Sequence, residues 1–370
     1  MKIDIPKRFY SLDILRGLAA LSVVLYHWNF FSYTHTAGST LAIYKQPWFD
    51  QLYLIYKFGD LAVQLFFCIS GFVFFWLYST RIAEKAVSFK VFSVLRISRL
   101  YPLHLATFIF VAAAQFYYHA MSGYFFAIPY NDAYHAILNL FLISSWGLEE
   151  GLSFNGPIWS VSVELMLYIL FFFFCRLFYR NVFALIIAVI VGYLMTRLSL
   201  SFGSGVMYFF LGGIGFVAYN KIIRSNDRFN LTLWLPLLML LACAILIAIN
   251  EFNESGVFSE SNELIKKIIA KNSILIFPLS IVSLALIETK KGSLGKKFAL
   301  IGDISYSTYL IHFPMQLFMA SIAVIFNLDK SLFFTHWFMV LFFTVLFLVS
   351  LISHKLFEIP IQNYLRRRLL

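Results

Sequence analysis

Charged residues are scarce in this sequence. Asp, Glu, Lys and Arg make up 13% of its 370 residues, whereas hydrophobic residues make up 61%, and the mean hydropathy is +0.81. A soluble core does not need so much apolar surface. The apolar residues also gather in runs of about 20, the length at which a helix crosses a membrane. The composition therefore excludes an ordinary soluble enzyme and predicts an integral membrane protein.

Cysteine is also rare. Cys68, Cys175 and Cys243 all lie within apolar segments, and they form neither a CxxC pair nor any spacing typical of a metal site. We interpret all three as small core residues. The sequence therefore predicts neither a redox centre nor a bound metal.

The apolar runs predict about ten transmembrane helices, because helices are the only spanning elements suited to runs of this length. We place them at residues 11–31, 59–79, 99–119, 157–178, 182–200, 204–220, 232–250, 271–288, 303–326 and 333–354. No repeat or appended soluble domain is visible in the sequence. The predicted fold is therefore an all-α polytopic membrane protein, with a single domain over residues 1–370.

Basic residues are distributed unevenly between the two sides of this arrangement. If the N-terminus is cytoplasmic, 21 of the 29 Lys and Arg residues fall inside, seven fall outside, and Arg16 lies in the membrane. Cytoplasmic loops of membrane proteins are enriched in Lys and Arg, so both termini are predicted to be cytoplasmic. The same bias accounts for the net charge of +11 without a nucleic-acid partner.

The second outer loop, from about Ala120 to Gly156, lacks Lys and Arg altogether. It contains an apolar stretch from Ala133 to Trp146 that is too short for a typical span. A re-entrant or interfacial helix is expected there.

Arg16 and His27 lie in the first span, eleven residues apart. Eleven steps of about 100° return to almost the same face of a helix, with a rise of roughly 16 Å. A guanidinium in hydrocarbon is costly unless it faces protein or a polar cavity, so this pair is a candidate functional site. The alternative is an Arg that reaches toward the membrane surface, together with a histidine satisfied within the core.

Glu164 falls about two turns below the outer surface in the fourth span, at a depth similar to that of His27. A carboxylate at this depth needs a partner, and a His oriented by a carboxylate is a common general base. The alternative is a structural pair that ties the two helices together.

Arg96 and Arg99 open the third span at the predicted cytoplasmic boundary and share one helical face. Planar guanidinium groups suit phosphates, so a site for a phosphate-bearing ligand is expected there. The alternative is ordinary positive flanking of a span.

The ninth span carries Tyr306, Tyr309 and His312 on one helical stripe, followed by Pro314. His312 either lines a cavity or hydrogen-bonds to a neighbouring helix. In the second span, Ser70 and Gly71 form a small notch whose simplest interpretation is close helix packing.

Together these segments resemble the acyltransferase-3 family of bacterial integral-membrane acyltransferases. The matching segments follow the family's order from residue 11 to about residue 366: Leu12–Gly17 with His27, Phe66–Phe72, Arg96 and Arg99 with Pro102, Trp159–Glu164, Ser305–Ser307 with His312 and Pro314, and Glu358–Pro360. One departure is that Leu165 follows Glu164 where the family often has a second acidic residue. Some members also carry an SGNH-type domain, which is not expected in this chain.

The resemblance implies transfer of an acyl group, usually acetyl, from cytoplasmic coenzyme A to a hydroxyl of an exported or cell-surface glycan or a lipid-linked saccharide. It also implies that Arg16 and His27 are essential and that the protein lies among the lipids of a bacterial cytoplasmic membrane. A proton-coupled transporter of a small polar solute is the alternative function.

These observations give a mechanistic hypothesis. His27 is the general base and is oriented by Glu164, while Arg16, Arg96 and Arg99 bind the acetyl-CoA or other acyl-CoA donor. Oxyanion or acceptor contacts are expected from Trp159, Ser160, Tyr306 and His312. Direct transfer in a ternary complex is preferred to an acyl-histidine intermediate.

Overall fold

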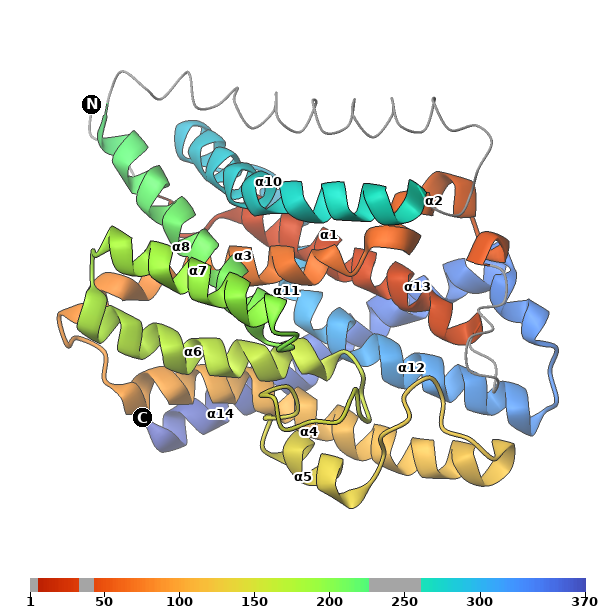
Figure 1. Cartoon of the computed structure of the whole chain (residues 1–370). Coiled ribbons are helices and arrows are strands. Elements are labelled where there is room, and N and C mark those ends of the chain that lie inside the picture. The colour runs from red at the N-terminus through yellow and green to blue at the C-terminus, as the bar shows by residue number, and fades with distance from the viewer. Residues whose placement is uncertain (1–5, 33–42, 226–260) are drawn as a thin grey trace.

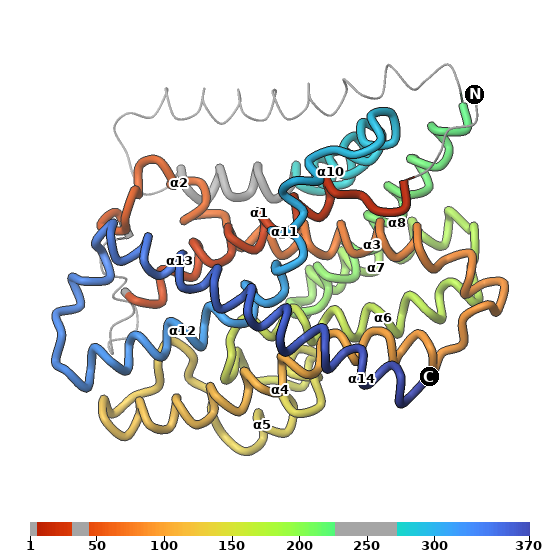
Figure 2. The backbone as a smooth tube through the Cα atoms, turned by 180° about the vertical axis from the view of Figure 1, so that it is seen from behind, coloured from red at the N-terminus to blue at the C-terminus, as the bar shows by residue number. Residues whose placement is uncertain are grey.

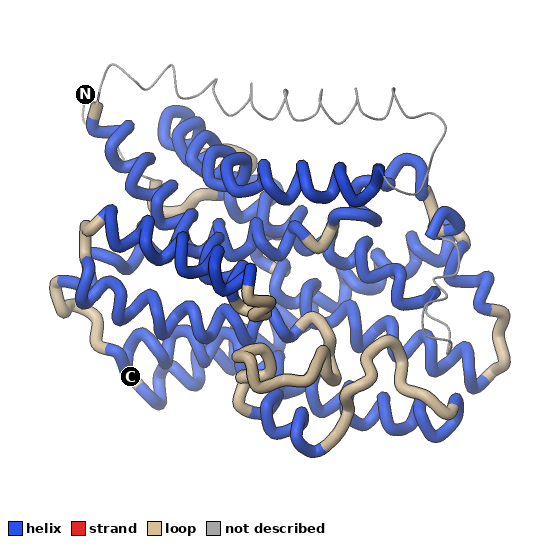
Figure 3. The backbone as a smooth tube through the Cα atoms, viewed as in Figure 1, coloured by secondary structure: helices blue, strands red, loops and turns tan. Residues whose placement is uncertain are grey.

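The computed structural model describes residues 6–32, 43–225 and 261–370, and these residues are almost entirely helical, with no strand among them. Figure 3 shows long helices joined by short connections, with one more extensive set of loops beside α4 and α5. The predicted all-α fold is therefore confirmed.

The helices pack side by side as a bundle (Figure 1). In chain order they are α1 (Tyr10–Tyr26), α2 (Phe49–Phe58), α3 (Leu61–Ala83), α4 (Phe89–Ser122), α5 (Ala133–Leu140), α6 (Ile158–Phe178), α7 (Val182–Arg197), α8 (Gly203–Arg224), α10 (Ser261–Lys291), α11 (Ala299–Asp303), α12 (Ser305–Ile325), α13 (His336–Ile352) and α14 (Ile359–Leu369). Short 3₁₀ turns are η1 (His27–Ser32), η2 (Ile43–Lys45), η3 (Lys296–Phe298) and η4 (Lys330–Phe334), and η5 (Ser353–Glu358) is a π-helix.

Eight stretches of the described residues are helical, long and apolar enough to cross a membrane, and they correspond to eight of the expected spans. A ninth, α7, is apolar but shorter, with 16 residues. The tenth expected span, 232–250, lies outside the described residues. The structure thus supports a polytopic membrane protein.

Close backbone contact joins α3 to α8. A Cβ atom added to Gly71 would lie 1.8 Å from the carbonyl oxygen of Phe209, and one added to Gly212 would lie 2.0 Å from that of Cys68. Only glycine fits at either position, as in other membrane helix pairs that pack through small residues. The predicted packing role of the notch at Ser70 and Gly71 is confirmed.

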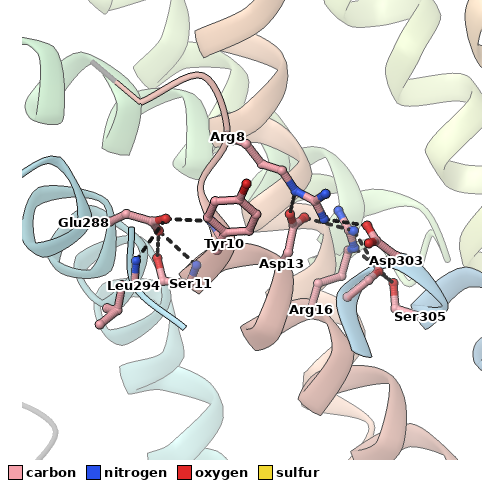
Figure 4. Close-up of polar contacts among 10 residues, drawn as sticks. Arg8, Tyr10, Ser11, Asp13, Arg16, Glu288, Leu294, Asp303 and Ser305 are labelled. Atoms are coloured by element: carbon pink, nitrogen blue, oxygen red, sulfur yellow. Dashed lines mark hydrogen bonds and ion pairs between the residues drawn. The ribbon is translucent and has the colours of Figure 1, made fainter. Parts of the chain in front are cut away.

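The start of α1 is held by a carboxylate from α10 (Figure 4). Glu288, which is fully buried, accepts hydrogen bonds from the backbone N–H groups of Tyr10 and Ser11 at 2.9 Å and from the Ser11 hydroxyl at 2.6 Å. The first N–H groups of a helix have no partner within the helix, so Glu288 caps α1 from a distant part of the chain.

The last helices form one continuous run. α13 passes through the π-helix η5 into α14, and Figure 2 shows this run crossing the bundle to lie beside α4. The sequence predicts a span ending at 354, whereas the helix continues to Leu369. α1 begins and α14 ends at the same end of the bundle.

The apolar stretch in the second outer loop forms α5, whose eight residues are too few to cross a membrane. Asp132 caps α5 by accepting from the backbone N–H of His135 at 2.9 Å, and this donor lowers the pKa of Asp132. The following loop folds back on α6, where the Ser145 N–H donates to the Ser162 hydroxyl and the Trp146 indole donates to the Ser162 carbonyl.

Candidate functional site

Two adjoining cavities occupy the half of the bundle where α1 begins. The terminal cavity, of about 520 Å³, is lined by the segment before α1 and by residues of α14, among others. The central cavity, of about 200 Å³, lies among α3, α4, α6 and α12. Both are lined by Arg16, Ile69, Val73, Leu77, Arg99 and Tyr306. These shared walls make the two cavities parts of one passage.

Arg16 projects from α1 toward the start of α12. Its Nε donates to the Ser305 hydroxyl at 3.0 Å, its Nη2 donates to the Gly302 carbonyl at 2.9 Å, and Asp13 pairs with it at 3.0 Å (Figure 4). The guanidinium therefore faces protein and a cavity, as the sequence predicts.

A second arginine of the terminal cavity is also paired with carboxylates. Arg8 contacts Asp13 and Asp303 at 2.5 Å each (Figure 4). The carboxylates of Asp13 and Asp303 thus neutralise the charges of Arg8 and Arg16.

Three further arginines lie near these pairs without a carboxylate partner in the described part of the chain. Arg96 lies over the rings of Phe74 and Tyr78, 5.1 Å from each centroid, and donates to the Tyr78 hydroxyl. Arg99 lines both cavities and is exposed in them, and Arg366 of α14 lines the terminal cavity. The prediction that Arg96 and Arg99 share a face is confirmed, since both line the central cavity.

Glu164 also lines the central cavity. Its carboxylate accepts from the hydroxyls of Tyr168 at 2.5 Å and Ser70 at 3.4 Å. The expected pair between Glu164 and His27 is therefore wrong. Similar depth in the membrane fixes the position along a helix but not the direction in which each side chain points, and these two side chains face different neighbours.

His27 lies where α1 passes into η1, and its partner is His312 of α12. His27 Nδ1 lies 2.9 Å from His312 Nε2, and the two rings stack with centroids 5.1 Å apart. His312 is fully buried, whereas His27 is half-buried and its Nε2 forms no hydrogen bond with a described residue. In the imidazole pair, His27 and His312, the nitrogen that is not buried and has no hydrogen bond to a described residue is therefore His27 Nε2, since the unpartnered Nδ1 of His312 is buried.

Both predicted residues of the first span therefore point toward α12, Arg16 at Ser305 and His27 at His312. The prediction from helical spacing that they share one face is confirmed. The alternative in which Arg16 reaches for the membrane surface does not agree with these contacts.

Tyr309 connects the central cavity to the imidazole pair. Its hydroxyl lies 2.8 Å from the Ser160 hydroxyl, and both residues line the cavity. Its ring lies 6.0 Å from that of His312, in an edge-on contact. His27 and His312 themselves line neither cavity, and Tyr309 is the cavity residue that contacts His312.

Of the other residues expected to contact the oxyanion or acceptor, Tyr306 lines the cavities and Trp159 does not. Tyr306 lines both cavities and donates to the Leu100 carbonyl at 2.5 Å. Trp159 packs against Phe67 outside the central cavity wall. The described residues contain no cluster of three or more His, Cys, Asp or Glu side chains that could hold a metal, and the absence of a metal stays a prediction.

Several residues of the passage were missed by sequence reasoning. Asp13, three residues before Arg16, could have been found as an ion-pair partner from helical spacing. Arg8 and Asp303 gave no signal, because the contact joins segments 295 residues apart. Arg366 was not among the predicted site residues, because the continuation of α13 into α14 was not predicted.

Comparison with known proteins agrees with this arrangement. The chain is 31% identical over 173 residues to "Acyltransferase MdmB" of Streptomyces mycarofaciens, a match over 44% of this chain and 38% of that protein. It is 33% identical over 108 residues to "Protein 2 in picA locus" of Rhizobium radiobacter, over 29% and 46% of the two chains. The chain thus spans less than half the length of these curated relatives.

No solved structure matches the chain. The sequence model of the acyltransferase-3 family, described as an acyltransferase domain, matches residues 9–354, which include Arg16, the whole lining of the central cavity and both imidazoles. The chain belongs to the acyltransferase-3 family.

Proposed function

We propose that this protein is a membrane-embedded O-acyltransferase. It takes an acyl group, most simply acetyl, from acyl-CoA at the cytoplasmic end of the passage. It transfers the group to a hydroxyl of an exported or cell-surface glycan, in a bacterial cytoplasmic membrane. Family membership and the membrane-spanning helices support the reaction class and the location in a membrane.

The observation that carries the proposal is the passage itself. Arginines line its terminal end, and Tyr309 leads from its central end to the imidazole pair. Coenzyme A has phosphates at one end and a thiol at the end of a long pantetheine arm. The arginines suit the phosphates, and the arm would extend along the central cavity toward His312.

The proposed chemistry uses the free Nε2 of His27 as the base. His27 Nδ1 and His312 Nε2 lie 2.9 Å apart. In the proposed tautomer His27 Nδ1–H donates to His312 Nε2, which leaves His27 Nε2 able to accept a proton. His27 Nε2 removes the proton of the acceptor hydroxyl while the oxygen of that hydroxyl bonds to the thioester carbonyl carbon. The C–S bond then breaks, and the proton passes from His27 to the departing thiolate.

Glu164 has a different role in this proposal from the one expected from the sequence. Glu164 lies in the central cavity and not against His27. In the cavity its carboxylate can accept a hydrogen bond from an amide N–H or the hydroxyl of the pantetheine arm. Ser160 and Tyr309 both line the central cavity, and Tyr309 also contacts His312, so their hydroxyl groups are the candidates for oxyanion stabilisation.

Membrane vesicles containing the full chain, supplied with radiolabelled acetyl-CoA on the cytoplasmic face, test the proposal. Label should appear as an ester on extracted glycan, and His27→Ala should abolish it without loss of inserted protein. The matched control is His119→Ala, because His119 is exposed on α4 and packs on Phe125. Transfer retained by His27→Ala would contradict the assignment of the base. Label that crosses the vesicle as an intact solute would favour a transporter.

A further inference from the structure

The C-terminal helix contributes a side chain to the passage. The π-helix η5 and α14 bring Arg366 back to α4. Arg366 Nε donates to the Ser98 hydroxyl at 3.3 Å, and Nη2 donates to the Leu95 carbonyl at 3.1 Å. Because Ser98 lies between Arg96 and Arg99 in the sequence, the guanidinium of Arg366 is held at the segment that carries those two arginines.

Three positive charges are thereby brought together. Arg96 and Arg99 are the cations that act electrostatically on Arg366, and none of the three forms an ion pair with a described residue. Like charges this close repel one another, and a bound anion relieves the repulsion.

The carboxylates of the terminal cavity are already engaged with other groups. Asp13 and Asp303 contact Arg8, and Asp13 also contacts Arg16. Glu358 accepts from the hydroxyls of Ser307 at 2.5 Å and Ser353 at 3.0 Å. The anion for Arg366 therefore has to come from outside these residues.

We infer that Arg366, presented by α14, binds a phosphate group of the acyl donor at the terminal end of the passage. The inference rests on the proposed function and makes it narrower. The donor is a thioester of a phosphorylated nucleotide. Its 3′-phosphate, the phosphate farthest from the thiol, is recognised by Arg366, which lies outside the Arg96 and Arg99 motif. A planar guanidinium suits a phosphate monoester because it donates two parallel hydrogen bonds.

Binding of coenzyme A and of dephospho-coenzyme A, which lacks the 3′-phosphate, by the purified full chain in nanodiscs tests the inference. Arg366→Ala should weaken coenzyme A binding roughly tenfold or more, as expected for a lost charged hydrogen bond, and should leave dephospho-coenzyme A binding unchanged. Arg366→Lys should give a smaller loss. In turnover, KM for the donor should rise while kcat stays the same.

Arg368→Ala is the matched control, because Arg368 lies two residues along the same helix, is exposed, and donates to the Tyr364 hydroxyl. It should change neither affinity. A misplaced α14 would weaken both ligands together, so equal losses for coenzyme A and dephospho-coenzyme A would overturn the inference.

If the phosphate of a lipid headgroup occupies Arg366 instead, Arg366→Ala should leave both nucleotide affinities unchanged and reduce co-purified anionic lipid. That result would also overturn the inference. In a third outcome, wild type binds coenzyme A more tightly than dephospho-coenzyme A, with the same ratio of affinities in Arg366→Ala. That result refutes the role of Arg366 and leaves the proposed function standing. A wild-type chain that binds neither nucleotide refutes the proposed function.

Discussion

The two ends of the passage are built from different chemistry. The terminal cavity has five Lys and Arg side chains, one histidine (His354) and three carboxylates, contributed by the N-terminal segment, α1, α4, α11, η5 and α14. Beyond the central end of the passage, on the far side of Tyr309, lie two stacked imidazoles that line neither cavity and form no ion pair with a described residue. Charge at the terminal end suits the binding of an anion, and an unpaired imidazole nitrogen suits proton transfer. Under the proposed function, donor binding and proton transfer therefore take place at different positions in the bundle.

α1 and α12 link these ends, since each contributes to both. α1 supplies Arg16 and His27, and α12 supplies Ser305, which contacts Arg16, and His312. Substitutions at the terminal end should therefore change donor binding, and substitutions at the imidazole pair should change the rate of acyl transfer.

The largest effect is expected at the imidazole pair. His312→Ala removes the partner that fixes the His27 tautomer, so kcat should fall by about 100-fold, at the low end for loss of general-base catalysis. Donor affinity should not change. A double variant with His27→Ala should be no slower than His27→Ala alone, because the two residues act as a unit. Steady-state kinetics with labelled donor measures both, and additive losses would contradict the pairing.

A smaller effect is expected from Arg99→Ala. Loss of a charged hydrogen bond to phosphate should weaken donor binding by roughly 10- to 100-fold. The rate at saturating donor should stay near the wild-type value. Isothermal titration in detergent measures the affinity, with Arg367→Ala, an exposed arginine outside both cavities, as the control. An unchanged affinity for coenzyme A would remove Arg99 from the donor site.

Glu288→Gln asks whether the terminal end depends on the cap of α1. The variant keeps the shape of the side chain but weakens three hydrogen bonds to Tyr10 and Ser11, so the free energy of unfolding should fall by about 1–3 kcal/mol. Thermal unfolding in detergent measures this, and Glu84→Gln, at an exposed helix end, should change nothing. Equal melting temperatures for Glu288→Gln and Glu84→Gln would show that the cap does not stabilise the fold.

The smallest effect is expected at α5, on the side opposite the terminal cavity. Asp132→Ala removes a helix N-cap and should cost about 1 kcal/mol of stability at neutral pH. The pKa of Asp132 is lowered in the fold, so its contribution is present above the ordinary pKa of Asp and is lost as the pH falls through the lowered value. The stability gap between wild type and variant should narrow with acidification. A gap that widens in acid would contradict this account of the cap.

Local periodicity predicted correctly whatever depends on one helix alone. Arg16 and His27 face the same neighbour, and Arg96 and Arg99 face the same cavity, because both statements need only the helical repeat. The boundaries were less certain. α4 begins at Phe89 and not near 99, because Lys90, Arg96 and Arg99 interrupt the apolar residues of its first turns and lower the hydropathy there.

Contacts between helices were beyond the reach of periodicity. The partner of His27 is His312 and not Glu164, because depth in the membrane does not fix the rotation of α6 about its axis. Arg366 was missed because the π-helix that carries α13 into α14 has no sequence signature that we recognised. Both cases concern the packing of whole helices against one another.

The close packing of α3 and α8 at Gly71 and Gly212 has a consequence for motion. Since the backbones of α3 and α8 touch with no side chain between them, these two helices cannot slide without breaking that contact and must move as a rigid pair. The central cavity has α3 as one wall. Any widening of this cavity therefore has to move α3 and α8 together, or move α4, α6 or α12 away from them.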